Sequence, residues 1–184
     1  ELPERQLHET LSALGDMYAH DVGDMGKARE YYAQALQDFE QTAPQRQAAF
    51  DAEKTQDDKD MARAINALSE ANIAANLGAM WQEAGDYAQA QKYYERTQQI
   101  GESLPEGGYI NIFSYAKAML RALALSYFAD LHSSTGEIEK AQSELDEVIK
   151  IRREIGKDES TAGTLQEAAR LHYVQGDLKT ARRY

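Results

Sequence analysis

The sequence predicts an all-α chain built from antiparallel helix hairpins. Helix-forming residues, chiefly Ala, Gln, Glu and Leu, dominate the 184 residues, and only three prolines interrupt them. Alternating runs of β-branched residues, which are typical of strands, do not occur in the sequence. A Gly followed by an acidic residue recurs four times between segments with a helical spacing of apolar residues. A repeated helix–turn–helix unit accounts for all of these observations.

Charge and composition disfavour several classes of function. The formal net charge is −11, so most of the surface would repel a phosphate backbone or an anionic membrane. We therefore expect no direct binding of nucleic acid and no membrane association. The lack of cysteine removes disulfides, thiol catalysis and cysteine-based zinc sites. No apolar run reaches the length of a membrane span and no signal peptide is visible, so we expect a cytoplasmic location.

The two most similar units lie at residues 14–36 and 77–97. Their sequences are LGDMYAHDVGDMGKAREYYAQAL and LGAMWQEAGDYAQAQKYYERT. Both begin with Leu-Gly, carry an aromatic residue three positions after that Gly, and reach a Gly-Asp turn before an Ala and a Tyr-Tyr pair. The first unit has one extra residue, which we place in the turn. The matched positions are Gly15 and Gly78, Tyr18 and Trp81, Gly23 and Gly85, Ala28 and Ala90, and Tyr31-Tyr32 and Tyr93-Tyr94.

Two weaker units follow toward the C-terminus. In the third unit, Phe128-Ala129 replaces Leu-Gly, His132 takes the aromatic position and Gly136-Glu137 forms the turn. In the fourth unit, the same three positions hold Ala168-Ala169, His172 and Gly176-Asp177. Four Gly-acidic turns with helical patterning on both sides are hard to produce by chance. The sequence therefore predicts four hairpins.

Each position of the unit has a physical reason. A small residue in the first helix lets the two helices approach closely, and we expect the Ala of the second helix to be its small partner. The Tyr or Leu that follows is expected to pack on the next hairpin. The turn Gly can adopt a positive φ and end the first helix. The acidic residue after it caps the second helix and favours its positive end.

These residues resemble the tetratricopeptide repeat. Leu77–Thr97 matches the family's pattern at nearly every signature position, the first unit almost as well, and the last two in part. The resemblance implies a right-handed superhelix (an α-solenoid) of antiparallel helix pairs, with a concave groove lined mainly by the first helices. The family's period is about 34 residues, whereas the turn glycines here are 62, 51 and 40 residues apart. Long-helix repeats of this kind resemble those of bacterial regulators and motor light chains.

The repeats can be assigned in order along one array over residues 1–184. The predicted repeats are 7–41, 58–103, 109–155 and 158–184. The segment 42–57 is assigned to an extra helix and a linker, because Thr42 suits an N-cap and Pro44 suits a first helical turn.

Helical stripes of apolar residues predict single long helices over 58–84 and 109–134, which explain the wide spacing of the turns. The Gly107-Gly108 pair is interpreted as a helix stop and restart. Because the chain starts with Glu1 and ends two turns into a helix, without a polar capping helix, we expect it to be part of a longer protein.

The sequence shows no pattern that predicts catalysis. His132 and His172 suggest either a metal pair or proton switch, or simple packing, and their place in the aromatic position favours packing. No histidine pair has the spacing of a helical zinc site, and no phosphate loop or dinucleotide motif occurs. No carboxylate has an apolar context that would raise its pKa for acid–base work. We therefore expect neither enzyme activity nor a cofactor or metal.

The first helix of each repeat should line the groove. The residues expected to contact a partner are Asn72, Asn76, Gln82, Tyr127, Asp130, Arg170 and Tyr173. Asn72 and Asn76 are the best candidates, because an Asn side chain can bond both backbone groups of an extended peptide. The alternative, that both are merely solvated polar residues, stays open.

Some members of the family bind chaperone C-terminal tails through a clamp of Lys, Asn, Asn, Lys and Arg. Only Asn76 matches that clamp, because its other positions hold Ser12, Asp16, Leu123 and Tyr127. A clamp without cations holds a carboxylate poorly. We therefore expect a basic or neutral polar protein or peptide as the partner, and not a chaperone tail.

The leading hypothesis is a protein- or peptide-binding scaffold that uses the concave groove. The alternative is a sensory or regulatory module, in which a small ligand or signal peptide changes the superhelical pitch and controls a fused effector domain. Solenoids suit such a role because each repeat contacts only its neighbours. A plain oligomerisation spacer is a further alternative.

Overall fold

A computed structural model describes residues 7–107, 111–156, 158–174 and 176–183. These residues form helices and turns, and no strand occurs among them. The elements in chain order are α1 (Leu7–Met17), a π-helical turn (Tyr18–Val22), α2 (Met25–Gln41), α3 (Ala43–Ala52), α4 (Gln56–Glu83), α5 (Tyr87–Ser103), α6 (Ile112–Thr135), α7 (Ile138–Glu154), α8 (Asp158–Val174) and α9 (Leu178–Ala181). The predicted all-α solenoid of helix hairpins is confirmed.

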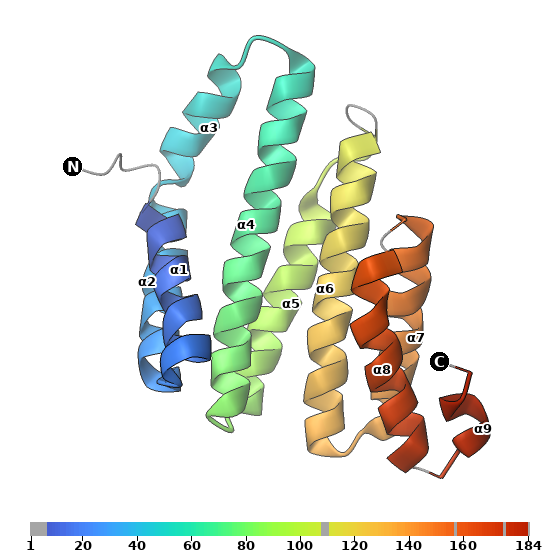
Figure 1. Cartoon of the computed structure of the whole chain (residues 1–184). Coiled ribbons are helices and arrows are strands. Elements are labelled where there is room, and N and C mark those ends of the chain that lie inside the picture. The colour runs from blue at the N-terminus through green and yellow to red at the C-terminus, as the bar shows by residue number, and fades with distance from the viewer. Residues whose placement is uncertain (1–6, 108–110, 157, 175, 184) are drawn as a thin grey trace.

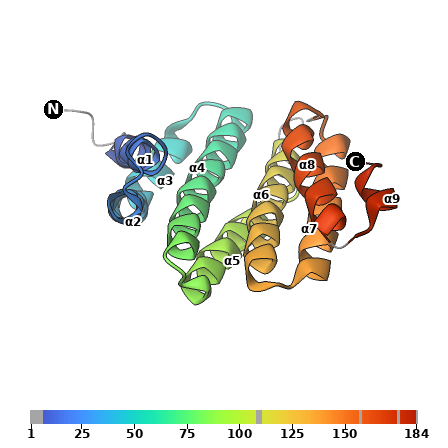
Figure 2. The ribbon, with the colours of Figure 1, turned by 60° about the horizontal axis from the view of Figure 1, so that its bottom comes forward.

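The helices stack side by side in two layers (Figures 1 and 2). α1, α4, α6 and α8 lie in one layer, and α2, α5 and α7 lie behind them. Each first helix packs on the helix that follows it, as α4 does on α5 and α6 does on α7. Neighbouring hairpins meet where α2 and α5 contact the next first helix and where α4 contacts α6. Of the first helices, α4 and α6 therefore contact each other directly as well as through α5.

The predicted long helices form as single helices. α4 has 28 residues and α6 has 24, while Tyr109 and Gly108, which the predictions included, lie outside the described residues. Gly107 has a φ of 84° and follows the end of α5. The added turns of α4 and α6 are buried in one cluster. Its buried members are Ala64, Ala67, Ala71, Leu104, Phe113, Ala116 and Leu120. Because the added helical segments bury one another, the Gly-acidic turns can lie far apart in sequence without a long loop between the helices.

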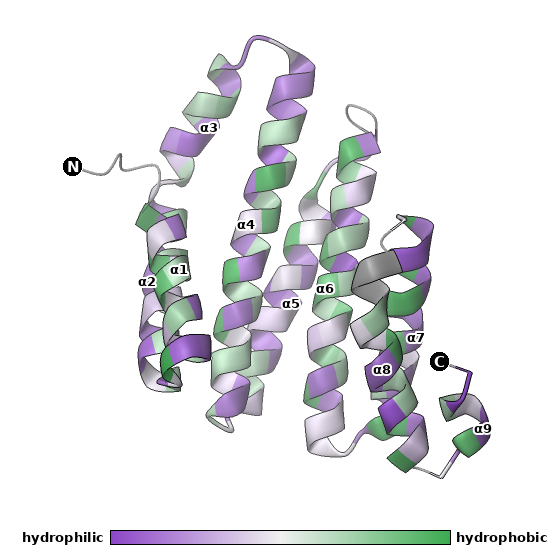
Figure 3. Ribbon diagram, viewed as in Figure 1, coloured by the Kyte–Doolittle hydropathy of each residue, from purple (hydrophilic) through white to green (hydrophobic). Residues whose placement is uncertain are grey.

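The predicted extra helix is α3, with Pro44 in its first turn. None of its residues is buried, and it stands beside the hydrophilic start of α4 (Figure 3). Thr42 precedes the helix but does not cap it with its side chain. Its hydroxyl donates instead to the Asp38 carbonyl oxygen at 2.8 Å, which extends the end of α2.

The close crossing inside each of the first two hairpins is filled by a tyrosine ring. A Cβ added to Gly15 would lie 2.8 Å from the Tyr32 ring, and one added to Gly78 would lie 2.6 Å from the Tyr94 ring. Tyr32 and Tyr94 are 1% and 0% exposed. The nearest atoms to each Gly therefore belong to the second Tyr of the pair, while the Ala residues of the second helices, Ala28 and Ala90, are fully buried.

The turns follow the sequence prediction. Positive φ values of 75°, 79°, 83° and 82° occur at Gly23, Gly85, Gly136 and Gly176. The carboxylates of Asp24, Asp86 and Asp177 each accept the backbone N–H three residues later, at 3.0, 3.0 and 3.1 Å. Glu137 departs from this pattern, because it pairs with the Lys140 side chain and makes no capping bond.

The extra residue of the first unit lies in its helix. The helix Gly and the turn Gly are one residue further apart there than in the second unit. The structure accommodates this residue in the π-helical turn Tyr18–Val22, whose Tyr18 carbonyl accepts the Asp24 N–H at 2.9 Å. A π-turn can absorb one inserted residue without breaking the helix. The placement of the extra residue in the turn is therefore corrected.

Candidate functional site

Asn76 and Tyr127, two of the predicted groove residues, meet on adjacent first helices. The Tyr127 hydroxyl of α6 donates to Asn76 Oδ1 of α4 at 3.0 Å. The Asn76 side chain also lowers the pKa of Tyr32, from α2, and the Tyr32 hydroxyl donates to Asp16 Oδ1 of α1 at 2.5 Å. This line of polar groups therefore joins α1, α2, α4 and α6.

A second line of hydrogen bonds begins at Tyr94 of α5. Its hydroxyl donates to Gln82 Oε1 at 2.9 Å, and Gln82 Nε2 donates to Asp130 Oδ2 of α6 at 2.7 Å. The rings of Tyr94 and Tyr127 stack with centroids 5.1 Å apart, which connects the two lines. We call the whole set the tyrosine–carboxylate network, and its members are Asp16, Tyr32, Asn76, Gln82, Tyr94, Tyr127 and Asp130.

The tyrosines of the network are held in their neutral form. Burial is the main cause that raises the pKa of Tyr32, and the hydrogen bond to Asp16 raises it further. Burial also dominates the raised pKa values of Tyr94 and Tyr127, to which the Asp130 charge contributes. Each hydroxyl therefore remains a proton donor near neutral pH, directed at a carboxylate or amide oxygen.

Two exposed carboxylates end the network. Neither Asp16 nor Asp130 takes part in an ion pair within the part of the chain that the structure describes. Glu83 of α4 is also exposed, and its charge contributes to the raised pKa of Tyr94. This face therefore carries carboxylates that form no ion pair among the described residues, although the Asp130 charge contributes to the raised pKa of the nearby Arg170.

Three predicted contact residues lie outside the network. Asn72 is exposed, and its amide donates to the Leu68 carbonyl of its own helix at 2.9 Å. Arg170 pairs with Glu167 at 2.5 Å. Tyr173 is 67% exposed and lines, with Arg170, a cavity of about 490 Å³ between α8 and α9. The other four predicted residues, Asn76, Gln82, Tyr127 and Asp130, come together in the network.

Sequence reasoning missed Tyr32 and Tyr94 as members of the site. Both rings are buried, and a Tyr expected to pack on the next hairpin gave no reason to expect a role for its hydroxyl. The missed signal is the Gly that each ring covers, because a helix without a side chain there lets the ring lie against it and brings the hydroxyl to a polar side chain of that helix. The neighbouring Tyr31 stacks on Tyr18 instead, with centroids 5.2 Å apart.

The two histidines in aromatic positions make packing contacts. His132 stacks on Phe128 with centroids 6.1 Å apart, and its Nδ1 lies 2.9 Å from Glu144 Oε2. His172 Nδ1 lies 3.1 Å from the Gln142 amide nitrogen. Among the described residues, no group of three or more His, Cys, Asp or Glu side chains is placed to hold a metal ion. These contacts agree with the packing interpretation of both residues.

The two hairpins with a Gly–Tyr crossing match known sequence families. Residues 8–37 match one model of the tetratricopeptide repeat, and residues 71–104 match a second. The chain contains tetratricopeptide repeats. The resemblance seen in the sequence is thereby confirmed, and repeats of this family generally serve as protein-interaction scaffolds.

The tetratricopeptide array also resembles a solved structure. The crystal structure of BtubC (BKLC) from P. vanneervenii aligns over 100% of this chain with a TM-score of 0.64 and 16% sequence identity. This chain spans 62% of that protein's length. At this identity the likeness shows the fold alone. A comparison with curated proteins finds no sequence that matches the chain. Of the helices described, none has both the length and the apolar character needed to cross a membrane.

Proposed function

We propose that this chain is a scaffold that binds a basic or neutral polar peptide segment of another protein on the face formed by α1, α4 and α6. The observation that carries the proposal is the tyrosine–carboxylate network. It places two unpaired, exposed carboxylates, Asp16 and Asp130, at the ends of hydrogen-bonded lines across neighbouring hairpins.

The network suits the recognition of cationic side chains. A carboxylate offers roughly four lone-pair sites, and within the network Tyr32 and Gln82 each donate to only one oxygen of Asp16 and Asp130, respectively. A Lys or Arg can therefore add a charge-assisted hydrogen bond without breaking the network. Because Tyr32 and Gln82 hold the carboxylates in place, less side-chain entropy is lost when a partner binds.

Catalysis by this face is not part of the proposal. The raised pKa values of its tyrosines make them poor general bases near neutral pH. The lack of cations among the network residues also argues against a chaperone tail, whose terminal carboxylate would meet Asp16 and Asp130.

We also propose that the hairpins α6–α7 and α8–α9 are the third and fourth repeats, 109–155 and 158–184. Support comes from their packing, in which Ala129 and Ala168 are buried in one cluster with Ala141, Leu145 and Leu171. Ala129 stands where the first two repeats have Gly, and Ala168 stands where they have the preceding Leu. The array would then present a face of first helices along its length.

Selection from a displayed random-peptide library tests the proposed function. The wild-type chain is the bait, and the variant Asp16→Asn/Asp130→Asn serves for counter-selection because it keeps side-chain shape and removes both charges. We expect the enriched peptides to carry Lys or Arg. Their affinity, measured by fluorescence anisotropy, should fall by about tenfold or more in the variant.

A matched control removes the same charge elsewhere. Glu95→Gln/Glu139→Gln changes two exposed residues of α5 and α7 that lie outside the network, and it should bind the selected peptides like the wild type. Equal loss in both variants would mean that only net charge matters. Peptides that bind the Asp16→Asn/Asp130→Asn variant as tightly as the wild type would refute the proposed site.

The regulatory alternative is favoured by one feature of the network. The Tyr127–Asn76 bond joins α6 to α4, so a ligand that competes for either group would change how neighbouring hairpins meet. Small-angle X-ray scattering of the chain with and without a selected peptide separates the two functions. A scaffold keeps its scattering profile, whereas a regulatory module changes its maximum dimension on binding.

A further inference from the structure

Arg170 of α8 stands near the acidic end of the tyrosine–carboxylate network without pairing with it. The hydrogen bond to Glu167 is the main cause that raises the pKa of Arg170, and the charges of Glu167 and Asp130 raise it further. Asp130 follows Ala129 of α6 directly in sequence, and Arg170 precedes Leu171 of α8. Ala129 and Leu171 are buried in one core cluster. Packing therefore fixes the backbone positions from which the two charged side chains extend.

Among the described residues, only Glu167 pairs with this arginine. It lies three residues before Arg170 on α8, and its oxygens accept hydrogen bonds from Nε at 3.1 and 3.0 Å and from Nη2 at 2.5 Å. Such a fork fixes the plane of the guanidinium. The side chains of Arg170 and Glu167 are 55% and 40% exposed, and exposed ion pairs contribute little free energy. The arginine is therefore held in one direction by a contact that is easily released.

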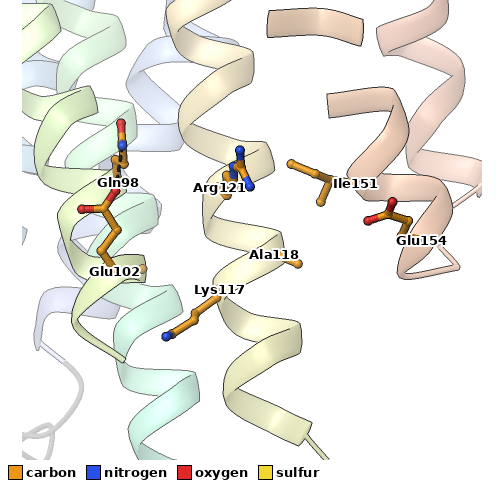
Figure 4. Close-up of a pocket in the computed structure, with 8 residues that line it drawn as sticks. Gln98, Glu102, Lys117, Ala118, Arg121, Ile151 and Glu154 are labelled. Carbon is orange, nitrogen blue, oxygen red and sulfur yellow. Dashed lines mark hydrogen bonds between the residues drawn. The ribbon is translucent and has the colours of Figure 1, made fainter. Parts of the chain in front are cut away.

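Arginines elsewhere in the array pair with carboxylates of other helices. Arg96 of α5 pairs with Glu40 of α2 at 2.6 Å and with Glu70 of α4 at 2.7 Å. In a cavity of about 550 Å³ between α5 and α7, Arg121 of α6 pairs with Glu147 of α7 beside two further carboxylates that line the cavity (Figure 4). The arginine of α8 differs, because its partner lies on its own helix. The carboxylate of α6 at the end of the network is left without an ion pair among the described residues.

We propose that Glu167 is a positioning residue, which keeps the binding face open by holding Arg170 away from Asp130. When Glu167 does not hold the guanidinium, it can turn to Asp130, the other carboxylate whose charge acts on it. It would then occupy the oxygen that a Lys or Arg of a partner would use, so the array's own arginine competes with the partner. This effect on binding rests on the proposed function, whereas the contact itself does not.

NMR spectra of the arginine side chains test the contact without any ligand. The Nε–H signal of Arg170, assigned by its loss in Arg170→Gln, should shift in Glu167→Gln because its charged acceptor is gone. Adding Asp130→Asn should move the signal again in the Glu167→Gln background, and should move it much less in the otherwise wild-type chain. A response to Asp130→Asn of equal size in both backgrounds would overturn the proposal.

A basic probe peptide tests the effect on binding. The probe is fluorescein-labelled (Ser-Lys)₄-amide, and its affinity is measured by fluorescence anisotropy. Glu167→Gln should weaken binding about fivefold, because the released arginine competes for Asp130. The double variant Glu167→Gln/Arg170→Gln should restore the affinity, since no arginine is left to compete. Unchanged affinity in Glu167→Gln, or no recovery in the double variant, would contradict the role of Glu167.

Two control variants separate this effect from net charge. Glu139→Gln removes one exposed charge from α7 and should bind the probe like the wild type. Glu167→Gln/Lys179→Gln has the net charge of the wild type but keeps Arg170, so its binding should stay weak. If net charge alone mattered, Glu139→Gln would bind as weakly as Glu167→Gln, and the proposal would be overturned.

The NMR and binding measurements also separate this inference from the proposed function. If Asp16→Asn/Asp130→Asn binds the probe like the wild type while the NMR response is present, the binding face is refuted and the contact of Arg170 with Asp130 stands. If that variant loses affinity while the NMR response is absent, the binding face stands and the role of Glu167 is refuted.

Discussion

The first two hairpins and the third use the same crossing position in different ways. In the first two, a Gly of the first helix faces Tyr32 or Tyr94, nine residues after the turn Gly. In the third, the corresponding residue is Leu145, which is buried with Ala129. A Leu fills the crossing but has no hydroxyl. The comparison indicates that the Gly–Tyr pairing has two results, a packed crossing and a hydrogen bond from the Tyr hydroxyl to a polar side chain of the first helix.

The residue one position earlier shows the same difference. Tyr31 stacks on Tyr18 in the first hairpin, whereas the equivalent contact in the third is the polar pair His132–Glu144, at 2.9 Å. The aromatic contact is insensitive to pH, and the polar contact contains a titratable carboxylate. The two kinds of hairpin should therefore respond differently to substitution and to pH.

The largest expected effect breaks the Gly–Tyr crossing. Gly78→Ala would place a Cβ 2.6 Å from the Tyr94 ring, and we expect it to lower the free energy of unfolding by about 2–3 kcal/mol. Gly163→Ala is the control, because no atom lies within 4 Å of its added Cβ. It should raise the free energy of unfolding by about 0.5–1 kcal/mol through helix propensity. Urea unfolding followed by circular dichroism measures both.

A second substitution converts this crossing to the type found in the third hairpin. Tyr94→Leu removes the ring that the new methyl group would meet, so the double variant Gly78→Ala/Tyr94→Leu should be more stable than the sum of the single effects predicts. If the losses in free energy of unfolding were additive, Gly78 would be required for a reason other than the Tyr94 ring. The crossing of the second hairpin would then not be equivalent to the crossing at Leu145 in the third.

The elements of the fold were predictable because their signals are local. Each turn Gly needs only its own positive φ, and Asp24 or Asp86 caps a helix that starts beside it. The long helices followed from an apolar stripe within one segment. The π-helical turn was not predictable in this way. An inserted residue can lengthen the loop between two helices or widen one helix, and the same sequence is compatible with either structure.

The candidate site was predictable only in part, since it depends on how hairpins meet. Helical periodicity placed Asn76 and Tyr127 on the groove side of their helices. Their hydrogen bond depends on the spacing and register of α4 and α6, which no local pattern contains. The hydroxyl of Tyr94 was missed for a related reason, because its path past Gly78 exists only once the hairpin has closed.

An intermediate effect should come from the hydroxyls alone. Tyr32→Phe removes the donor to Asp16, and we expect a loss of about 1–2 kcal/mol in the free energy of unfolding, since the acceptor is charged. Tyr94→Phe should cost about 1 kcal/mol, because Gln82 is neutral. Tyr93→Phe tests the other member of the pair and should stay within about 0.5 kcal/mol of the wild type. If Tyr32→Phe costs no more than Tyr93→Phe, the network does not stabilise the fold.

The smallest expected effect depends on pH and belongs to the third hairpin. The expectation that no carboxylate has a context that raises its pKa is wrong at Glu144. Burial is the main cause that raises the pKa of Glu144, and it outweighs the hydrogen bond with His132, which lowers that pKa. Lys140 lowers the pKa further and Glu137 raises it, so these two charges partly cancel. The folded chain therefore binds a proton at Glu144 more tightly than the unfolded chain does.

A raised carboxyl pKa contributes stability that is fully present below the unfolded-state pKa and is lost as pH rises through the folded-state pKa. Glu144→Gln cannot ionise, so the variant should gain stability relative to the wild type between about pH 4 and pH 7. Urea unfolding at a series of pH values measures this difference, and Glu139→Gln, an exposed residue of the same helix, controls for the loss of one charge. A difference that instead shrinks as pH rises would mean that the bond to His132 outweighs burial. The ionised Glu144–His132 pair would then stabilise the third hairpin. The Tyr18–Tyr31 stack has the equivalent position in the first hairpin and carries no charge.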